Sequence, residues 1–143
     1  MKPVFKYRTF LLLAVIGLLN SSCKKEETGP ANSVVIQQFD PNSPATLNFE
    51  EFVVITTAYD ISNSDGARIW VQPYTEGEKS PGFLYSSSRV YYGSGIREVG
   101  ISVEETEYET VLVDQLRIIV TTPDQDQDLF ERFIDVSYTF TNK

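Results

Sequence analysis

The chain of 143 residues contains no histidine and only one cysteine, Cys23. The absence of histidine excludes the usual general base, the Ser-His and Cys-His nucleophile pairs and the histidine-containing zinc sites. A carboxylate pair of the kind that glycosidases use remains chemically open. The acidic run between residues 104 and 109 is better explained as a solvated loop, which consists of Glu104, Glu105, Glu107 and Glu109. We therefore expect a protein that is not an enzyme and has no catalytic residues.

Basic residues are also scarce, because 12 lysines and arginines stand against 20 aspartates and glutamates. A strongly acidic chain without a basic stripe argues against nucleic acid as a partner and against adsorption to anionic lipid. Residues 33–143 have the length of one domain. That length is sufficient for one core without support from disulfides, which a single cysteine cannot provide.

Long apolar runs are missing as well. The longest, Phe10 to Leu19, has ten residues, whereas a membrane-spanning helix needs about 20. It follows the cationic residues Lys2, Lys6 and Arg8 and precedes a short polar stretch. This layout is typical of a secretory signal peptide, which we place at residues 1–22.

The segment Leu19-Asn20-Ser21-Ser22-Cys23 resembles the lipobox of a bacterial lipoprotein precursor of the Bacteroidetes type, although Asn20 stands where leucine is usual. The resemblance implies cleavage between Ser22 and Cys23, acylation of Cys23 and anchoring in the outer membrane. Cleavage would remove three basic residues and no acidic ones, leaving nine against 20 and a formal charge of −11. Two or three acyl chains would then anchor the chain. The alternative is an ordinary secretory signal with a stray cysteine.

Four charged residues follow the cysteine: Lys24, Lys25, Glu26 and Glu27. They resemble the signal that sends Bacteroidetes lipoproteins to the outer face of the outer membrane. The alternative is a solvated tether, so both the periplasmic and the extracellular face stay open. In either case we interpret residues 23–32 as the lipidated cysteine and a flexible linker.

Beyond this linker the patterns are those of short strands, and none has a sustained helical period. The expected strands are residues 33–39, 51–59, 67–73, 89–92, 98–103, 116–120 and 130–140. Alternation predicts that Ile69 and Val71 face the core while Trp70 faces away. We expect residues 75–82 to form an irregular connection and Gly93-Ser94-Gly95 to form a flexible link.

About seven short strands in roughly 110 residues predict an all-β fold, with one immunoglobulin-like antiparallel β-sandwich over residues 33–143. A small barrel is the alternative. The segments 68–73 (RIWVQP) and 113–117 (VDQLR) are similar to those of small immunoglobulin-like domains in Bacteroidetes surface proteins. That resemblance implies a fold and no activity.

Alternating carboxylates occur in the connection before the last strand, at Asp124, Asp126 and Asp128. Such spacing can turn several hard oxygens toward one calcium ion. The loop is not an EF-hand, because Leu129 occupies the position of the tight-turn glycine. We expect either a calcium site of another geometry or a polar hairpin loop, and no other cofactor.

Aromatic residues gather in the middle of the chain, where a set of possible ligand-binding side chains comprises Trp70, Tyr74, Tyr85, Tyr91 and Tyr92. Exposed together, they would form a platform for sugar rings or for a protein partner. In a small sandwich such residues more often belong to the core. The sequence thus favours a lipid-anchored binding or structural module with an unknown protein or glycan partner. The alternative is a glycan-binding accessory protein of a nutrient-uptake system.

Overall fold

The computed structural model describes residues 32–84 and 87–142. The expected signal peptide, Cys23, the charges after it and Tyr85 lie outside the described residues. The regular secondary structure of the described residues consists of strands. Those residues contain no helix that could cross a membrane. The strands are β1 (Ser33–Asp40), β2 (Ala45–Asn48), β3 (Val53–Ile61), β4 (Ala67–Thr75), β5 (Glu78–Lys79), β6 (Val90–Tyr91), β7 (Gly93–Ile101), β8 (Thr110–Thr121) and β9 (Asp128–Thr141).

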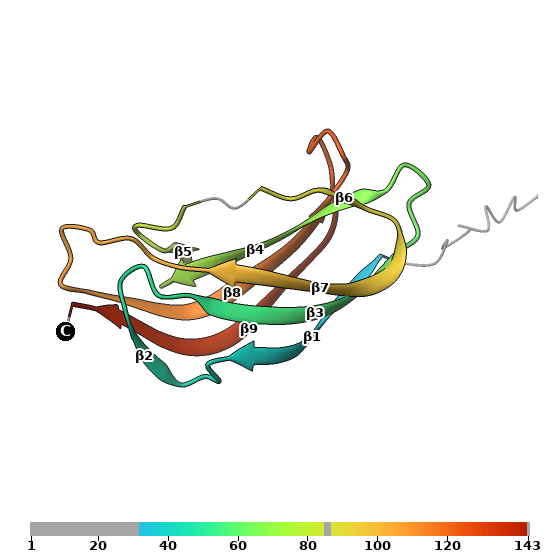
Figure 1. The fold of residues 1–143 in the computed structure, drawn as a ribbon. Helices are drawn as coiled ribbons and strands as arrows, with labels where there is room; N and C mark the ends of the chain where they lie inside the picture. Colours follow the sequence, from blue (N-terminus) through green and yellow to red (C-terminus); the bar gives the residue numbers. More distant parts are fainter. Residues whose placement is uncertain (1–31, 85–86, 143) are drawn as a thin grey trace, which may run out of the picture.

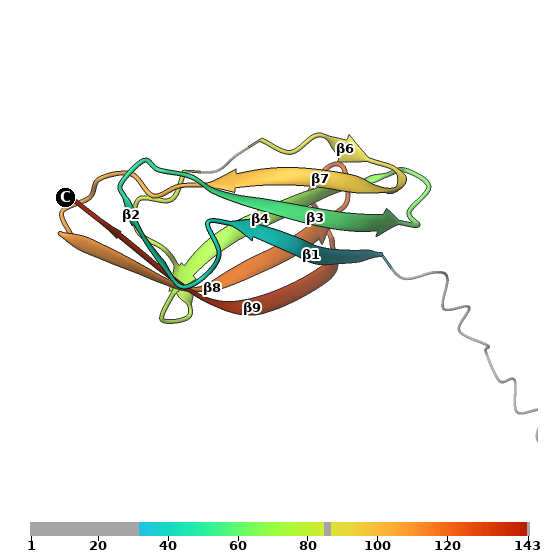
Figure 2. The ribbon, with the colours of Figure 1, turned by 60° about the horizontal axis from the view of Figure 1, so that its bottom comes forward.

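The strands form two sheets that pack face to face (Figure 1). One sheet has three antiparallel strands in the order β1-β3-β7, and the other has six, with the order β2-β9-β8-β4-β5 and β6 beside β4. Figure 2 shows the two layers, with β1, β3 and β7 above β4, β8 and β9. The prediction of an all-β fold is confirmed in this form of two packed sheets.

The core lies between the sheets and is built from the alternate residues of each strand. Its fully buried side chains include Ile55, Ile69, Leu116, Tyr138 and Phe140. On β3 the alternation also brings Thr57 inside, where its hydroxyl donates a hydrogen bond to the Arg97 carbonyl oxygen at 3.2 Å. A buried hydroxyl is tolerated because it is satisfied in this way.

The predicted faces of β4 are confirmed. Ile69 and Val71 are buried whereas Trp70 is only half-buried, on the outer face of the larger sheet. The strand expected at 51–59 is an interior strand, since β3 pairs with β1 on one side and β7 on the other. The glutamate run at 104–109 lies in the connection between β7 and β8, outside the strands.

Three local expectations are wrong or incomplete. Residues 75–82 include strand β5, which forms a tight hairpin with β4 through Glu76 and Gly77 at φ values of 51° and 85°. Gly93-Ser94-Gly95 is the start of β7, and a Cβ at Gly95 would come within 2.5 Å of the Tyr59 hydroxyl oxygen. The glycine there allows Tyr59 to lie across the strand. Strand β2 was not expected, because its partner β9 is more than 90 residues away in sequence.

The sandwich has two ends, which we call the N-terminal end and the opposite end. The N-terminal end carries the start of β1 and the loop between β8 and β9 (Figure 1). The opposite end carries the β4–β5 hairpin, the connection between β7 and β8, and the last residues of β9. The first described strand, β1, therefore begins at the N-terminal end.

Candidate functional site

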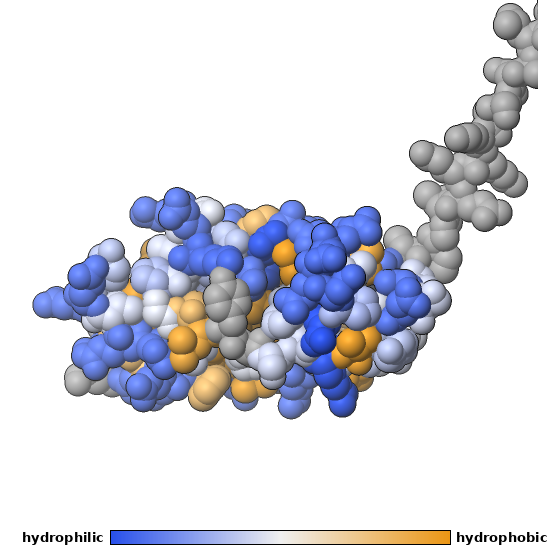
Figure 3. Space-filling model, turned by 90° about the horizontal axis from the view of Figure 1, so that it is seen from above, coloured by the Kyte–Doolittle hydropathy of each residue, from blue (hydrophilic) through white to orange (hydrophobic). Residues whose placement is uncertain are grey.

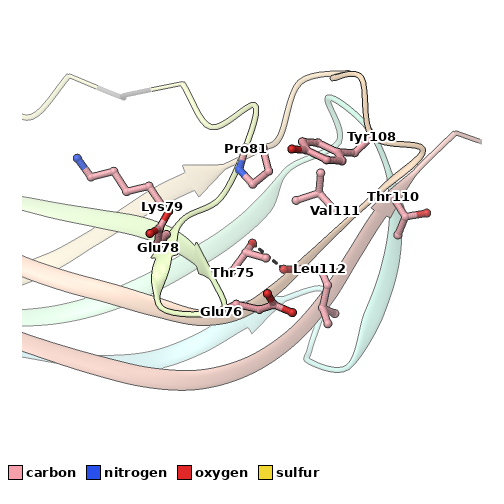
Figure 4. A pocket seen from close by; sticks show the side chains of 9 residues that line it. All are labelled: Thr75, Glu76, Glu78, Lys79, Pro81, Tyr108, Thr110, Val111 and Leu112. Atoms are coloured by element: carbon pink, nitrogen blue, oxygen red, sulfur yellow. Dashed lines mark hydrogen bonds between the residues drawn. The ribbon is translucent and has the colours of Figure 1, made fainter.

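A groove of about 570 Å³ lies at the opposite end of the sandwich. We consider it the main candidate for a binding site because of its volume. Its walls come from the β4–β5 hairpin, the segment that follows it and the start of β8 (Figure 4). The lining residues are Thr75, Glu76, Glu78, Lys79, Pro81, Tyr108, Thr110, Val111 and Leu112. This volume falls within the range of about 300–1,000 Å³ that is usual for ligand pockets.

Hydrogen bonds fix the hairpin side of the groove against β8. The Thr75 hydroxyl donates to the Leu112 carbonyl oxygen at 2.7 Å and also contacts the Ser80 hydroxyl at 2.8 Å. The backbone N–H of Glu76 donates to a carboxylate oxygen of Asp114 at 2.9 Å. The hairpin turn is thus tied to the neighbouring strand by side chains as well as by the sheet ladder.

The connection between β7 and β8 forms the other wall and is held against Gly82. The N–H of Glu104 donates to the Gly82 carbonyl oxygen at 2.9 Å, and Phe83 pairs with Val103 as an isolated bridge. Gly82 has a φ of +71°, and a Cβ there would lie 2.6 Å from the Glu104 carbonyl oxygen. Glycine is therefore required for this close approach.

The groove combines an apolar floor with an acidic rim. Tyr108 and Leu112 are 53 % and 45 % exposed, and in Figure 4 the Tyr108 ring lies over Val111. Glu76 and Glu78 are exposed at the hairpin, whereas the Lys79 side chain extends away from the groove (Figure 4). This arrangement suits a ligand that presents apolar groups together with positive charge.

A further negative charge near the groove belongs to Asp114, which lies beneath the hairpin. One carboxylate oxygen of Asp114 is buried without a hydrogen-bond partner among the described residues, while the other accepts the Glu76 N–H. The connection between β7 and β8 adds exposed glutamates beside Tyr108. Of the described residues that line the groove, only Lys79 is basic. Among the described lining residues, the charge balance is therefore negative.

The expected calcium ligands lie at the N-terminal end, in the loop between β8 and β9. The Asp128 carboxylate lies 3.7 Å from the Arg117 guanidinium, and Asp124 accepts a hydrogen bond from the backbone N–H of Asp126 at 3.4 Å. A hydrogen bond from Thr122 holds the pKa of Asp124 below its ordinary value. Within residues 32–84 and 87–142 no three carboxylates converge as a metal site. Calcium binding by this loop stays a prediction.

The aromatic residues do not share one exposed face. Tyr74 and Tyr91 are only 9 % and 8 % exposed. Tyr74 meets Phe133 edge-on, with ring centroids 5.4 Å apart. Trp70 is half-buried on the outer face of the larger sheet, and its indole N–H donates to Thr121 at 3.4 Å. Tyr92 is exposed. The flat aromatic platform that glycan binding would need is therefore not favoured by this geometry.

Exposed apolar side chains are otherwise scattered. Seen from above, they form separate spots between polar residues (Figure 3). The large ones are Val35, Phe52, Leu84, Tyr92, Ile96, Tyr108, Leu112 and Phe133. The sequence pattern did not indicate Tyr108 or Leu112 as site residues. The signal that was available is an aromatic residue within a run of glutamates, EETEYE at 104–109.

Comparison with known proteins gives no relative from which a function could be transferred. No family model, no curated protein and no solved structure matches the chain.

Proposed function

We propose that the chain is a lipid-anchored, non-catalytic binding module of the outer membrane that presents its groove away from the membrane. The observation that carries this proposal is the position of the groove. β1, which continues the chain from Cys23, begins at the N-terminal end, whereas the groove lies at the opposite end (Figure 1). An anchor on Cys23 would hold the N-terminal end toward the bilayer and leave the groove free.

We also propose that the sandwich is of the immunoglobulin-like type. In such domains a sheet with adjacent strands G, F and C packs on a sheet that contains A, B and E. Here β9-β8-β4 and β1-β3-β7 take these positions in the order of the chain. The chain passes from the smaller sheet to the larger between β1 and β2, at residues 41–44, so that β2 runs parallel to β9. Apolar packing replaces the inter-sheet disulfide of antibody domains.

The partner that fits the groove is a protein segment with basic and apolar side chains. Its apolar groups would cover Tyr108 and Leu112, and its positive charges would lie against the exposed glutamates of the hairpin. A groove of this size takes a few side chains, so the contact depends on a short segment. A second copy of the chain is a poor occupant, because after cleavage nine basic residues stand against 20 acidic ones, a formal charge of −11.

Photocrosslinking in intact cells tests the proposal. A photoreactive phenylalanine in place of Tyr108 should yield one discrete adduct, and the same probe in place of Ile96 on β7 should not. Leu112→Lys should abolish the adduct, because it removes an apolar contact and places a positive charge against the basic partner, whereas Val35→Lys at the exposed side of β1 should leave it unchanged. An adduct that forms equally from both probe positions would contradict a specific groove.

The anchor is tested separately by Cys23→Ala. We expect this variant to leave the membrane fraction while its domain unfolds at the same urea concentration as the unchanged protein. Retention of the variant in the membrane fraction would refute the lipid anchor. Unfolding of its domain would mean that Cys23 has a structural role.

A further inference from the structure

Three arginines from different segments meet around Ser88. Arg68 of β4 donates to the Ser88 carbonyl oxygen, and Arg97 of β7 donates to the Ser88 hydroxyl at 3.4 Å. Arg89 follows directly in the chain. The fold therefore brings three guanidinium groups together, although the chain has an excess of acidic residues.

Arg89 and Arg97 share one aromatic ring. Both guanidinium carbons lie 5.0 Å from the centroid of Tyr91, so they are separated by no more than twice that distance. Tyr91 is itself held in place, because it is buried and meets Tyr59 edge-on with the centroids 5.1 Å apart. Arg89 is exposed, whereas Arg97 is half-buried. Two cations thus contact one buried ring, and one of them is open to solvent.

No carboxylate balances these charges within the described part of the chain. Arg117 forms ion pairs with Asp128 and Glu131, whereas Arg89 and Arg97 form none with the described residues. Burial, together with the neighbouring charge of Arg89, lowers the pKa of Arg97. A partly buried cation without a counterion is unfavourable. The pair would therefore gain from an anion that both guanidinium groups can contact.

Arg97 has a structural contact and still has donors to spare. It donates to the carbonyl oxygen of Ile69, and the Ser88 hydroxyl accepts the Ile69 N–H at 3.1 Å. These contacts provide hydrogen-bond partners for the backbone groups of Ile69, which lies on β4 between the residues that pair with β6 and those that pair with β5. All hydrogen bonds of Arg97 to described residues leave from Nη1. A guanidinium carries five N–H donors, and Nη2 and Nε donate to none of the described residues.

We propose that Arg89 and Arg97, fixed by Tyr91, form a binding site for a phosphate group. Arginine matches phosphate geometry because its planar fork can donate two parallel hydrogen bonds. The site lies toward the N-terminal end, since Ser33 pairs with Asp60 and Asp60 pairs with Ser94 at the start of β7. The phosphate is either a free ion or part of a lipid headgroup. Only the headgroup source rests on the proposed lipid anchor.

Titration of the full chain in a nonionic detergent with inorganic phosphate tests the site. We expect saturable shifts of the arginine Nε–H resonances in NMR spectra. Arg89→Gln should weaken binding about tenfold or more, the scale of a lost charge-assisted contact, and Arg89→Lys should restore part of it. Arg132→Gln, at an exposed arginine of β9, is the matched control and should bind as the unchanged chain does. Absence of saturable binding, or equal binding by the Arg89→Gln and Arg132→Gln variants, would overturn the proposal.

The source of the phosphate is distinguished in nanodiscs. In discs of a digalactosyl lipid, which carries no phosphate, added phosphate should produce the same shifts as in detergent. In phosphatidylglycerol discs the response should be lost if headgroups already occupy the site, and should persist if the ligand is free phosphate. A chain that fails to associate with either disc but still binds phosphate would refute the lipid anchor and leave the phosphate site supported.

Discussion

Tyr138 offers the sharpest test of how the two sheets are joined. It lies on β9, is fully buried, and its hydroxyl donates to the Pro41 carbonyl oxygen at 3.0 Å. Pro41 belongs to the link by which the chain passes from the smaller sheet to the larger. In the register of the strands Tyr138 stands beside Ala45, the first residue of β2. One hydroxyl therefore ties the crossing segment to the strand that receives it.

The expected loss in the free energy of unfolding follows from the groups that each substitution removes. Tyr138→Phe keeps the ring and loses one neutral hydrogen bond, which contributes about 1 kcal/mol to the free energy of unfolding. Tyr138→Ala also removes the ring and leaves a cavity, and we expect a loss of about 3–5 kcal/mol. A domain of this size is stable by about 5–15 kcal/mol, so the alanine variant should be close to unfolding. Urea unfolding followed by Trp70 fluorescence measures both changes.

Alkaline pH adds a second criterion for the same residue. Burial raises the pKa of Tyr138 above its ordinary value of 10.0. A raised pKa means that the stability contribution is complete below pH 10 and is lost as the pH rises through the folded value. The stability advantage over Tyr138→Phe should therefore shrink above pH 10. Equal stability of the two proteins at pH 7, or an advantage that does not change with alkaline pH, would refute the reasoning.

Two further predictions concern the groove and the loop between β8 and β9. Gly82→Ala should destabilise the domain by about 1–2 kcal/mol more than Gly77→Ala, because both have positive φ but only Gly82 lies against the Glu104 carbonyl oxygen; equal urea midpoints would contradict this. A hydrogen bond from Thr122 lowers the pKa of Asp124. The contribution of the Asp124 carboxylate to the free energy of unfolding should therefore be present above about pH 4 and be lost as the pH falls through the pKa of the folded state. Asp124→Asn should remove that acid dependence below about pH 4, and an unchanged dependence over a titration from pH 6 to 3 would count against it.

The sequence determined those features that depend on neighbours along the chain. Alternation identified the faces of β4, because successive side chains of a strand point to opposite sides. The buried residues Val99, Ile101 and Val103 follow this rule. An Asp-Gly pair is typical of a turn, and Gly66 after Asp65 has a φ of 76° with its N–H bonded to the Asn63 carbonyl oxygen. Absence of histidine likewise restricted the chemistry before any fold was known.

Burial of individual aromatic residues was decided by the tertiary structure. Tyr74 and Trp70 share the outer face of β4, and alternation treats them alike. Tyr74 is covered because Phe133 of β9 lies against it, whereas Trp70 is only half-covered. Arg97 follows the inward pattern of β7, although its charge alone would favour solvent. Its place is explained by the Ile69 carbonyl oxygen of the other sheet, which requires a donor.

The groove and the phosphate site were likewise beyond the sequence. Thr75 and Leu112 are 37 residues apart, and their hydrogen bond exists only because β4 and β8 are neighbours in the larger sheet. The parallel pairing of β2 with β9 spans a still longer stretch of the chain. A local pattern specifies which way a side chain points, but not which distant segment meets it. That choice is made by the packing of the two sheets, because each must bury its apolar face against the other.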